Sequence, residues 1–75
     1  MESKYVLCLN RSINTILRNP TYVENIRCSL VDSFLIKDID RVLNNLEAYG
    51  CLYISGSGYI VVHDVGLFNE YFALV

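Results

Sequence analysis

Residues 39–52 decide the fold, and they read Ile39-Asp40-Arg41-Val42-Leu43-Asn44-Asn45-Leu46-Glu47-Ala48-Tyr49-Gly50-Cys51-Leu52. Apolar residues recur in this stretch at the three- and four-residue spacing of a helix with one buried face. Gly50 follows the last periodic residue, where helices commonly end on a left-handed glycine. The stretch therefore predicts an amphipathic helix that leads directly into an extended segment.

This helix extends back to about residue 37, and its two faces differ in chemistry. The apolar face is a stripe roughly 140° wide, made of Ile36, Ile39, Val42, Leu43, Leu46 and Tyr49. The opposite face is polar, with Lys37, Arg41, Asn44 and Ala48 at its centre and Asp40 and Asn45 at its sides. We expect Leu43 and Leu46 to be buried and the polar face to meet solvent or a ligand.

After Gly50 the period of the pattern changes from 3.6 residues to two. The β-rich runs 51–54 and 59–62 flank Ser55-Gly56-Ser57-Gly58, whose glycines permit the positive φ angles of a tight hairpin. Apolar residues then return at helical spacing in residues 64–75, which predicts a short amphipathic C-terminal helix.

The N-terminal half adds two helices and a short extended piece. Residues 11–18 predict a helix that ends before Pro20, because the residue before a proline is pushed out of the α region. Residues 4–9 fit either a strand or an earlier part of that helix, with Ser3 as a possible N-cap. An extended piece at 21–23 precedes a second helix at about residues 24–31, with Ile26, Leu30 and Val31 on its apolar side.

In this element order and in residues 39–52, the chain resembles the winged helix-turn-helix superfamily. The resemblance covers about residues 11–62 and implies an α+β fold of three helices with a β-hairpin wing. With the C-terminal amphipathic segment 64–75, residues 1–75 then form a single winged-helix domain. Residues 39–46 are also weakly similar to the third helix of Z-form nucleic acid-binding domains, although only Lys37 and the apolar frame match, so this similarity implies the fold alone.

The resemblance implies a nucleic-acid contact surface. In DNA-binding winged-helix proteins the exposed face of the third helix enters the major groove, where Arg suits the guanine edge and Asn the adenine edge. Carried over by position, the contact residues are Lys37, Asp40, Arg41, Asn44 and Asn45 on the helix and Ser57 in the wing.

Three departures from that pattern count against tight DNA binding. Asp38 and Asp40 place negative charge on the helix, where it would repel phosphate. The wing tip has no Lys or Arg, and Leu35 stands where the superfamily usually has a capping Ser or Thr. The net charge is −2, and all six basic residues precede residue 42.

Composition and aromatic content favour an interface. Apolar residues make up 53% of the chain, which is rich for a small domain and indicates apolar surface covered by a partner or a second copy. We expect a homodimer whose interface lies on the C-terminal helix at Leu67, Phe68, Tyr71 and Phe72. The alternative is that this helix folds back onto the first helix and completes a monomeric core.

The sequence offers no set of residues for catalysis or metal binding. His63 is the only histidine, and Cys8, Cys28 and Cys51 form no Cys-x-x-Cys pair. We therefore expect no metal, no cofactor and no enzymatic activity, and three reduced, largely buried thiols. An intermolecular disulfide through an exposed cysteine is the alternative.

No apolar run approaches the roughly 18 residues of a membrane span, and Met1-Glu2-Ser3-Lys4 lacks the apolar core of a secretory signal. We expect an intracellular, cytoplasmic protein with no membrane contact. The leading functional hypothesis is a small transcription regulator that reads double-stranded DNA with its third helix. The rival is a winged-helix protein–protein interaction module, such as a small viral or phage effector, that binds no nucleic acid.

Overall fold

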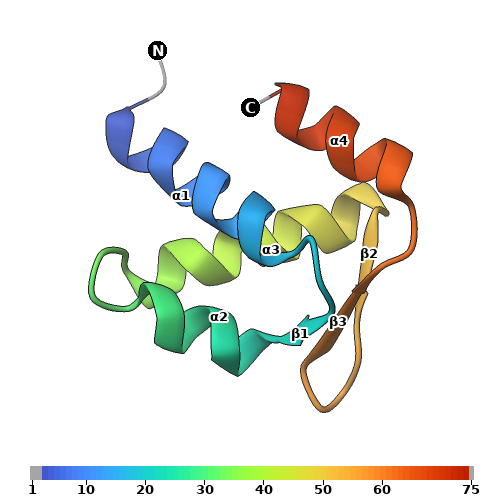
Figure 1. Cartoon of the computed structure of the whole chain (residues 1–75), viewed down its shortest axis with the longest axis horizontal. Coiled ribbons are helices and arrows are strands. Elements are labelled where there is room, and N and C mark those ends of the chain that lie inside the picture. The colour runs from blue at the N-terminus through green and yellow to red at the C-terminus, as the bar shows by residue number, and fades with distance from the viewer. Residues whose placement is uncertain (1–2, 75) are drawn as a thin grey trace.

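A computed structural model of the chain describes residues 3–74 and shows four helices and three strands within them (Figure 1). The helices are α1 (Lys4–Ile16), α2 (Val23–Leu30), α3 (Ile36–Tyr49) and α4 (Val65–Leu74). The strands are β1 (Thr21–Tyr22), β2 (Leu52–Ile54) and β3 (Tyr59–Val62). The domain is thus of the α+β class, and its element order is compatible with the expected winged helix.

The strands form one antiparallel sheet in the order β1-β3-β2, so β3 pairs on both sides. Two backbone hydrogen bonds of Ser55 close the turn between β2 and β3. Its N–H donates to the Tyr59 carbonyl, and its carbonyl accepts from the Gly58 N–H. Gly58 has a φ of 87°, a left-handed conformation that glycine adopts without steric cost. The hairpin expected at residues 51–62 is confirmed.

The structure resolves the choice left open for residues 4–9, because α1 is helical from Lys4 onward. The Ser3 hydroxyl accepts a hydrogen bond from the Val6 N–H at 3.1 Å and so caps the first turn. Past this cap the apolar side chains Leu9 and Ile13 keep helical spacing and are both buried. The helix ends at Ile16, ahead of Pro20, as expected.

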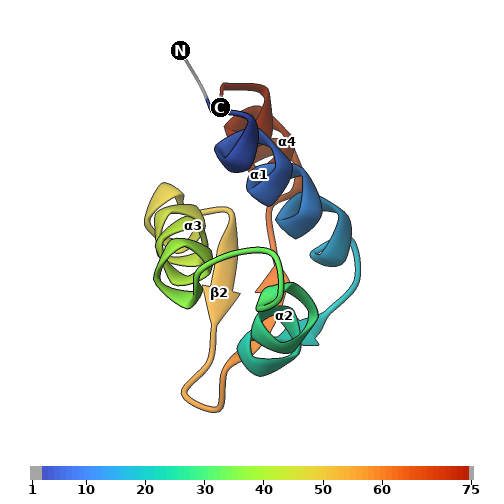
Figure 2. The same cartoon turned by 90° about the vertical axis from the view of Figure 1, so that its left-hand side faces the viewer.

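The core lies where the helices meet the inner face of the sheet. In Figure 2, α3 lies on one side of the molecule, α2 lies below, and α1 and α4 lie together on the other side. The buried apolar side chains are Leu9, Ile13, Leu17, Ile26, Leu30, Ile39, Val42, Leu43, Leu46, Cys51, Leu52, Ile60 and Phe68. Every helix therefore contributes to one cluster.

Four side chains expected in the interior are exposed instead. Cys8 and Cys28 are exposed and only Cys51 is buried, so the expectation of three largely buried thiols is wrong for two of them. Ile36 and Val31 were both expected on apolar stripes, but Ile36, the first residue of α3, is 38% exposed and Val31, just after α2, is 51% exposed. No helix of residues 3–74 has both the length and the apolar character needed to cross a lipid bilayer.

Replacing Leu46 by Ala should lower the free energy of unfolding by about 2–5 kcal/mol, because Leu46 is fully buried on the inner face of α3. Urea unfolding followed by circular dichroism measures the change. Leu74→Ala is the matched control, since Leu74 is 71% exposed and its truncation should cost no more than about 0.5 kcal/mol. Equal effects of the two substitutions would contradict the assigned core.

Candidate nucleic-acid interface

The exposed face of α3 carries most of the contact residues that the sequence indicates. Lys37, Arg41, Asn44 and Asn45 are all exposed, and so is Ser57 at the hairpin turn. In Figure 2, α3 and this turn lie on the same side of the molecule. The Ser57 hydroxyl is 3.0 Å from the Ser55 hydroxyl, so the turn is held within itself.

Asp40 does not share this face. It is half-buried toward α2, where its two carboxylate oxygens accept hydrogen bonds from Nε and Nη2 of Arg27, each at 2.9 Å. This two-point bond fixes both planar groups and neutralises the carboxylate. Asp40 is therefore not a free contact residue, contrary to the sequence-based expectation, and it ties α3 to α2 instead.

Asp38 is also held within the chain. Its Oδ2 accepts a 2.7 Å hydrogen bond from the Tyr5 hydroxyl, and its Oδ1 lies 3.8 Å from Nη1 of Arg41, one turn further along α3. The same Tyr5 oxygen accepts the Leu35 N–H at 3.0 Å. Leu35 has no side-chain cap to offer, so a tyrosine from α1 supplies the cap of α3.

These contacts raise the pKa values of Tyr5 and Arg27. The Leu35 N–H favours the Tyr5 phenolate, but the hydrogen bond and the charge of Asp38, together with burial, outweigh it and raise the pKa of Tyr5 above its ordinary value. The hydrogen bonds and charge of Asp40 raise the pKa of Arg27. The charged form of Arg27 is thus favoured beside Asp40.

The C-terminal half of α3 is braced by its neighbours. Glu47 accepts the Ile54 N–H from β2 at 3.1 Å, and the Tyr49 hydroxyl donates to Glu70 of α4 at 2.8 Å. Asn45 lies beside the Tyr71 hydroxyl, where it partly offsets the rise that burial causes in the pKa of Tyr71. Asn45 thus faces the α4 side of α3, and Lys37, Arg41 and Asn44 form the open row.

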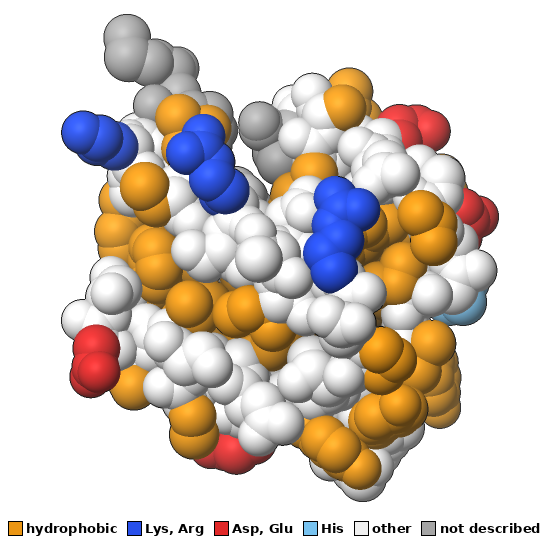
Figure 3. Space-filling model, viewed as in Figure 1, with side chains coloured by type: hydrophobic (Ala, Val, Ile, Leu, Met, Phe, Trp, Pro, Cys, Tyr) orange, Lys and Arg blue, Asp and Glu red, His pale blue; other side chains and the backbone are white. Residues whose placement is uncertain are grey.

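A second basic surface lies on α1. Lys4, Arg11 and Arg18 are exposed at seven-residue spacing, and residues 4–18 contain no Asp or Glu. Figure 3 shows Lys and Arg side chains spread over this face, with acidic side chains toward the edge of the view. Figure 2 places α1 across the molecule from α3. Their separation cannot be seen in the sequence, where all six basic residues simply precede residue 42.

The residues expected at a dimer interface lie mostly against their own chain. Phe68 is 2% exposed, and the Arg18 guanidinium lies over its ring at 5.5 Å from the ring centre. Phe68 is therefore a core residue and cannot face a partner. Leu67, Tyr71 and Phe72 are half-buried, so a dimer through α4 stays a prediction that rests on those three.

Sequence reasoning missed Tyr5 and Arg27, the two residues that position α3 from other helices. No local signal marks them, because their partners lie 30 to 33 and 13 residues away. The absence of a capping residue at Leu35 was the one available hint that a distant side chain must supply the cap. Within residues 3–74 no group of three or more His, Cys, Asp or Glu side chains is placed to hold a metal ion.

No protein-family model, curated protein or solved structure matches the chain.

The Arg27–Asp40 bond should show a coupling of about 1 kcal/mol in a double-mutant cycle built from Arg27→Met and Asp40→Asn, because the bond is bidentate and only partly exposed. Thermal or urea unfolding gives the four stabilities. The control cycle is Arg41→Met with Asp38→Asn, a single longer contact for which we expect about 0.3 kcal/mol. Couplings of equal size would show that Arg27 does not specifically anchor α3.

Alkaline pH should destabilise the wild type more than Tyr5→Phe. A folded-state pKa above the unfolded one contributes stability below about pH 10, and that stability is lost as the pH rises through the folded-state pKa. Unfolding free energies measured from pH 8 to 11 should therefore fall less steeply for Tyr5→Phe. Parallel curves would mean that the Tyr5 hydroxyl does not hold Asp38 in solution.

Proposed function

We propose that the chain is a winged-helix protein that binds double-stranded DNA with the exposed face of α3. One observation carries the proposal: all three acidic side chains of α3 are engaged within the chain. Asp40 is paired with Arg27, Asp38 is bonded by Tyr5 and close to Arg41, and Glu47 accepts from β2. The carboxylates that counted against phosphate binding are thus bonded to other parts of the chain.

What remains on the open face suits a DNA groove. Lys37 and Arg41 are one turn apart and can contact phosphates or a guanine edge, and Asn44, next in the row, can pair with an adenine edge. The strand order β1-β3-β2, with the hairpin beside α3, supports the winged-helix assignment, in which the wing would approach the DNA backbone. The hairpin turn brings no positive charge, so α3 supplies the ionic part of binding.

A second candidate, protein binding, is favoured by the outer face of the sheet. Alternation along the strands turns Tyr22, Tyr53, Tyr59 and Val61 outward, and each is exposed by more than a third of its surface. Tyr22 and Tyr59 are cross-strand neighbours whose ring centres lie 5.1 Å apart. Exposed tyrosines of this kind are typical of protein interfaces. This face has no Lys or Arg, so it does not suit nucleic acid.

DNA binding is tested by fluorescence anisotropy with labelled duplex DNA at two or more salt concentrations. We expect a shallow salt dependence, corresponding to roughly two to four phosphate contacts per chain. Lys37→Gln combined with Arg41→Gln should weaken binding about tenfold or more and flatten the salt dependence, because both positive charges of the open face are lost.

The matched control is Lys4→Gln combined with Arg11→Gln, which removes the same charge from the opposite side of the molecule. We expect this control to retain most of the affinity. Equal losses in the two variants would indicate non-specific attraction to the whole protein. Absence of binding by wild type at low salt would reject the DNA proposal and leave the tyrosine face as the candidate site.

A further inference from the structure

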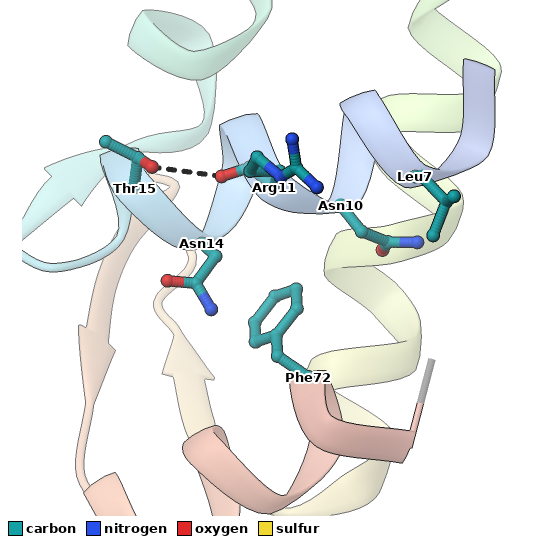
Figure 4. Close-up of a pocket in the computed structure, with 6 residues that line it drawn as sticks. All are labelled: Leu7, Asn10, Arg11, Asn14, Thr15 and Phe72. Carbon is teal, nitrogen blue, oxygen red and sulfur yellow. Dashed lines mark hydrogen bonds between the residues drawn. The ribbon is translucent and has the colours of Figure 1, made fainter. Parts of the chain in front are cut away.

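A groove between α1 and α4 carries an inference that does not depend on DNA binding. It has a volume of about 390 Å³ and opens on the basic face of α1. Leu7, Asn10, Arg11, Asn14 and Thr15 line it from α1, and Phe72 lines it from α4. Figure 4 shows the Asn10 and Asn14 side chains on the α4 side of α1 and the Phe72 ring reaching toward them.

Asn10 is the unusual residue of this groove. It is 8% exposed, and its Oδ1 is fully enclosed without a hydrogen-bond partner among the described residues. A buried polar atom left without a partner costs stability, and such atoms are rare in folded proteins. Rotation about the last side-chain bond exchanges Oδ1 and Nδ2, so either end of the carboxamide can be turned to the groove.

The polar side of the groove favours an anion. Arg11 is exposed, and no salt bridge engages it within residues 3–74. Nε and Nη2 of Arg18 both donate to Asn14 Oδ1, at 3.1 and 2.9 Å, so the amide group that Asn14 has left to offer is a donor. Arg11 and Asn14 are thus one turn apart on α1, and both offer hydrogens to a negatively charged group.

The apolar side of the groove is an aromatic ring held in place. Phe72 packs against Phe68 at a ring-centre distance of 5.0 Å and against Tyr71 at 5.1 Å, both nearly edge-on. These neighbours fix the ring, and Leu7 of α1 adds a second apolar side chain to the groove lining. A flat apolar group entering the groove would therefore meet a preformed aromatic surface.

We propose that this groove binds an adenine nucleotide. Adenine presents an N–H donor beside a ring-nitrogen acceptor, and the end of the Asn10 carboxamide that is turned to the groove can bond to one of them while the other end stays enclosed. The Phe72 ring supplies the apolar contact that nucleobases make with aromatic side chains, and Arg11 with Asn14 supplies the phosphate contact. The volume lies within the range of small-ligand sites. The ligand can be a free nucleotide or an unpaired nucleotide of a single strand, since both present an adenine base and a phosphate.

The test uses the whole chain and AMP as the probe, followed by isothermal titration and by ¹H–¹⁵N NMR. We expect saturable binding at one site, with shifts centred on α1 and the C-terminal part of α4. Ribose 5-phosphate lacks the base and makes neither the Asn10 nor the Phe72 contact. Its affinity should therefore be lower than that of AMP by about tenfold or more. A short single strand of dA, titrated in parallel, shows whether a strand rather than a free nucleotide is the preferred source.

Asn10→Leu is the decisive variant, because it keeps the size of the side chain and removes the carboxamide. We expect about a tenfold or greater loss of AMP affinity and a melting temperature equal to or above that of wild type, since an unpartnered polar atom is removed. Arg11→Gln should also weaken AMP. Lys4→Gln is its matched control, since it removes one exposed charge from the same helix outside the groove.

Binding of AMP or of the dA strand that depends on both Asn10 and Arg11 supports the proposal. No saturable binding of either probe at millimolar concentration overturns it. Equal losses for Lys4→Gln and Arg11→Gln also overturn it, because they would show attraction to the basic face alone. An acidic peptide that binds in an Asn10-dependent manner while AMP and the dA strand do not would assign the groove to a protein ligand and reject the nucleotide.

Discussion

Burial of one stripe of α3 is the constraint on which the rest of the domain depends. Ile39, Leu43 and Leu46 are almost completely enclosed, and the apolar sides of the other helices and the inner face of the sheet close around them. The described residues form one such cluster, and each helix and the sheet contribute side chains to it. The polar contacts of α3 then set its alignment within that packing: Tyr5 at its start, Arg27 at its side, and β2 and Glu70 at its end.

Elements whose signals are local could be predicted from the sequence. The period of α3, the left-handed Gly50 after it and the glycine-containing hairpin were all identified, because each depends on residues a few positions apart. Residues 4–9 stayed ambiguous because Tyr-Val-Leu-Cys-Leu has the composition of a strand, and only the Ser3 cap and the buried Leu9 favour the helix. Exposure at helix ends, as for Ile36, depends on where neighbouring elements stop. The periodicity of the sequence does not carry that information.

The candidate site was predictable to a similar depth. Helical spacing correctly grouped Lys37, Arg41 and Asn44 on an exposed face, but it could not show that Asp40 turns to Arg27 or that Phe68 is a core residue. Those outcomes arise from contacts between helices. They also change the meaning of the net charge of −2, because acidic side chains are engaged at the edges of α3 while α1 carries only basic ones. The acidic chain thus presents two separate basic surfaces.

The dimensions of the sheet bear on how the protein behaves at high concentration. Both edge strands are very short: β1 has two residues and β2 has three, and only the central β3 is longer. Unpaired strand edges are templates for intermolecular β-pairing, and many natural proteins limit this pairing by keeping their edge strands short. On the β2 edge the Glu47 carboxylate also occupies the Ile54 N–H and adds a negative charge there. A chain rich in β-branched and aromatic residues is thereby protected against growth of the sheet into fibrils, and the face of the sheet rather than its edge is left for association.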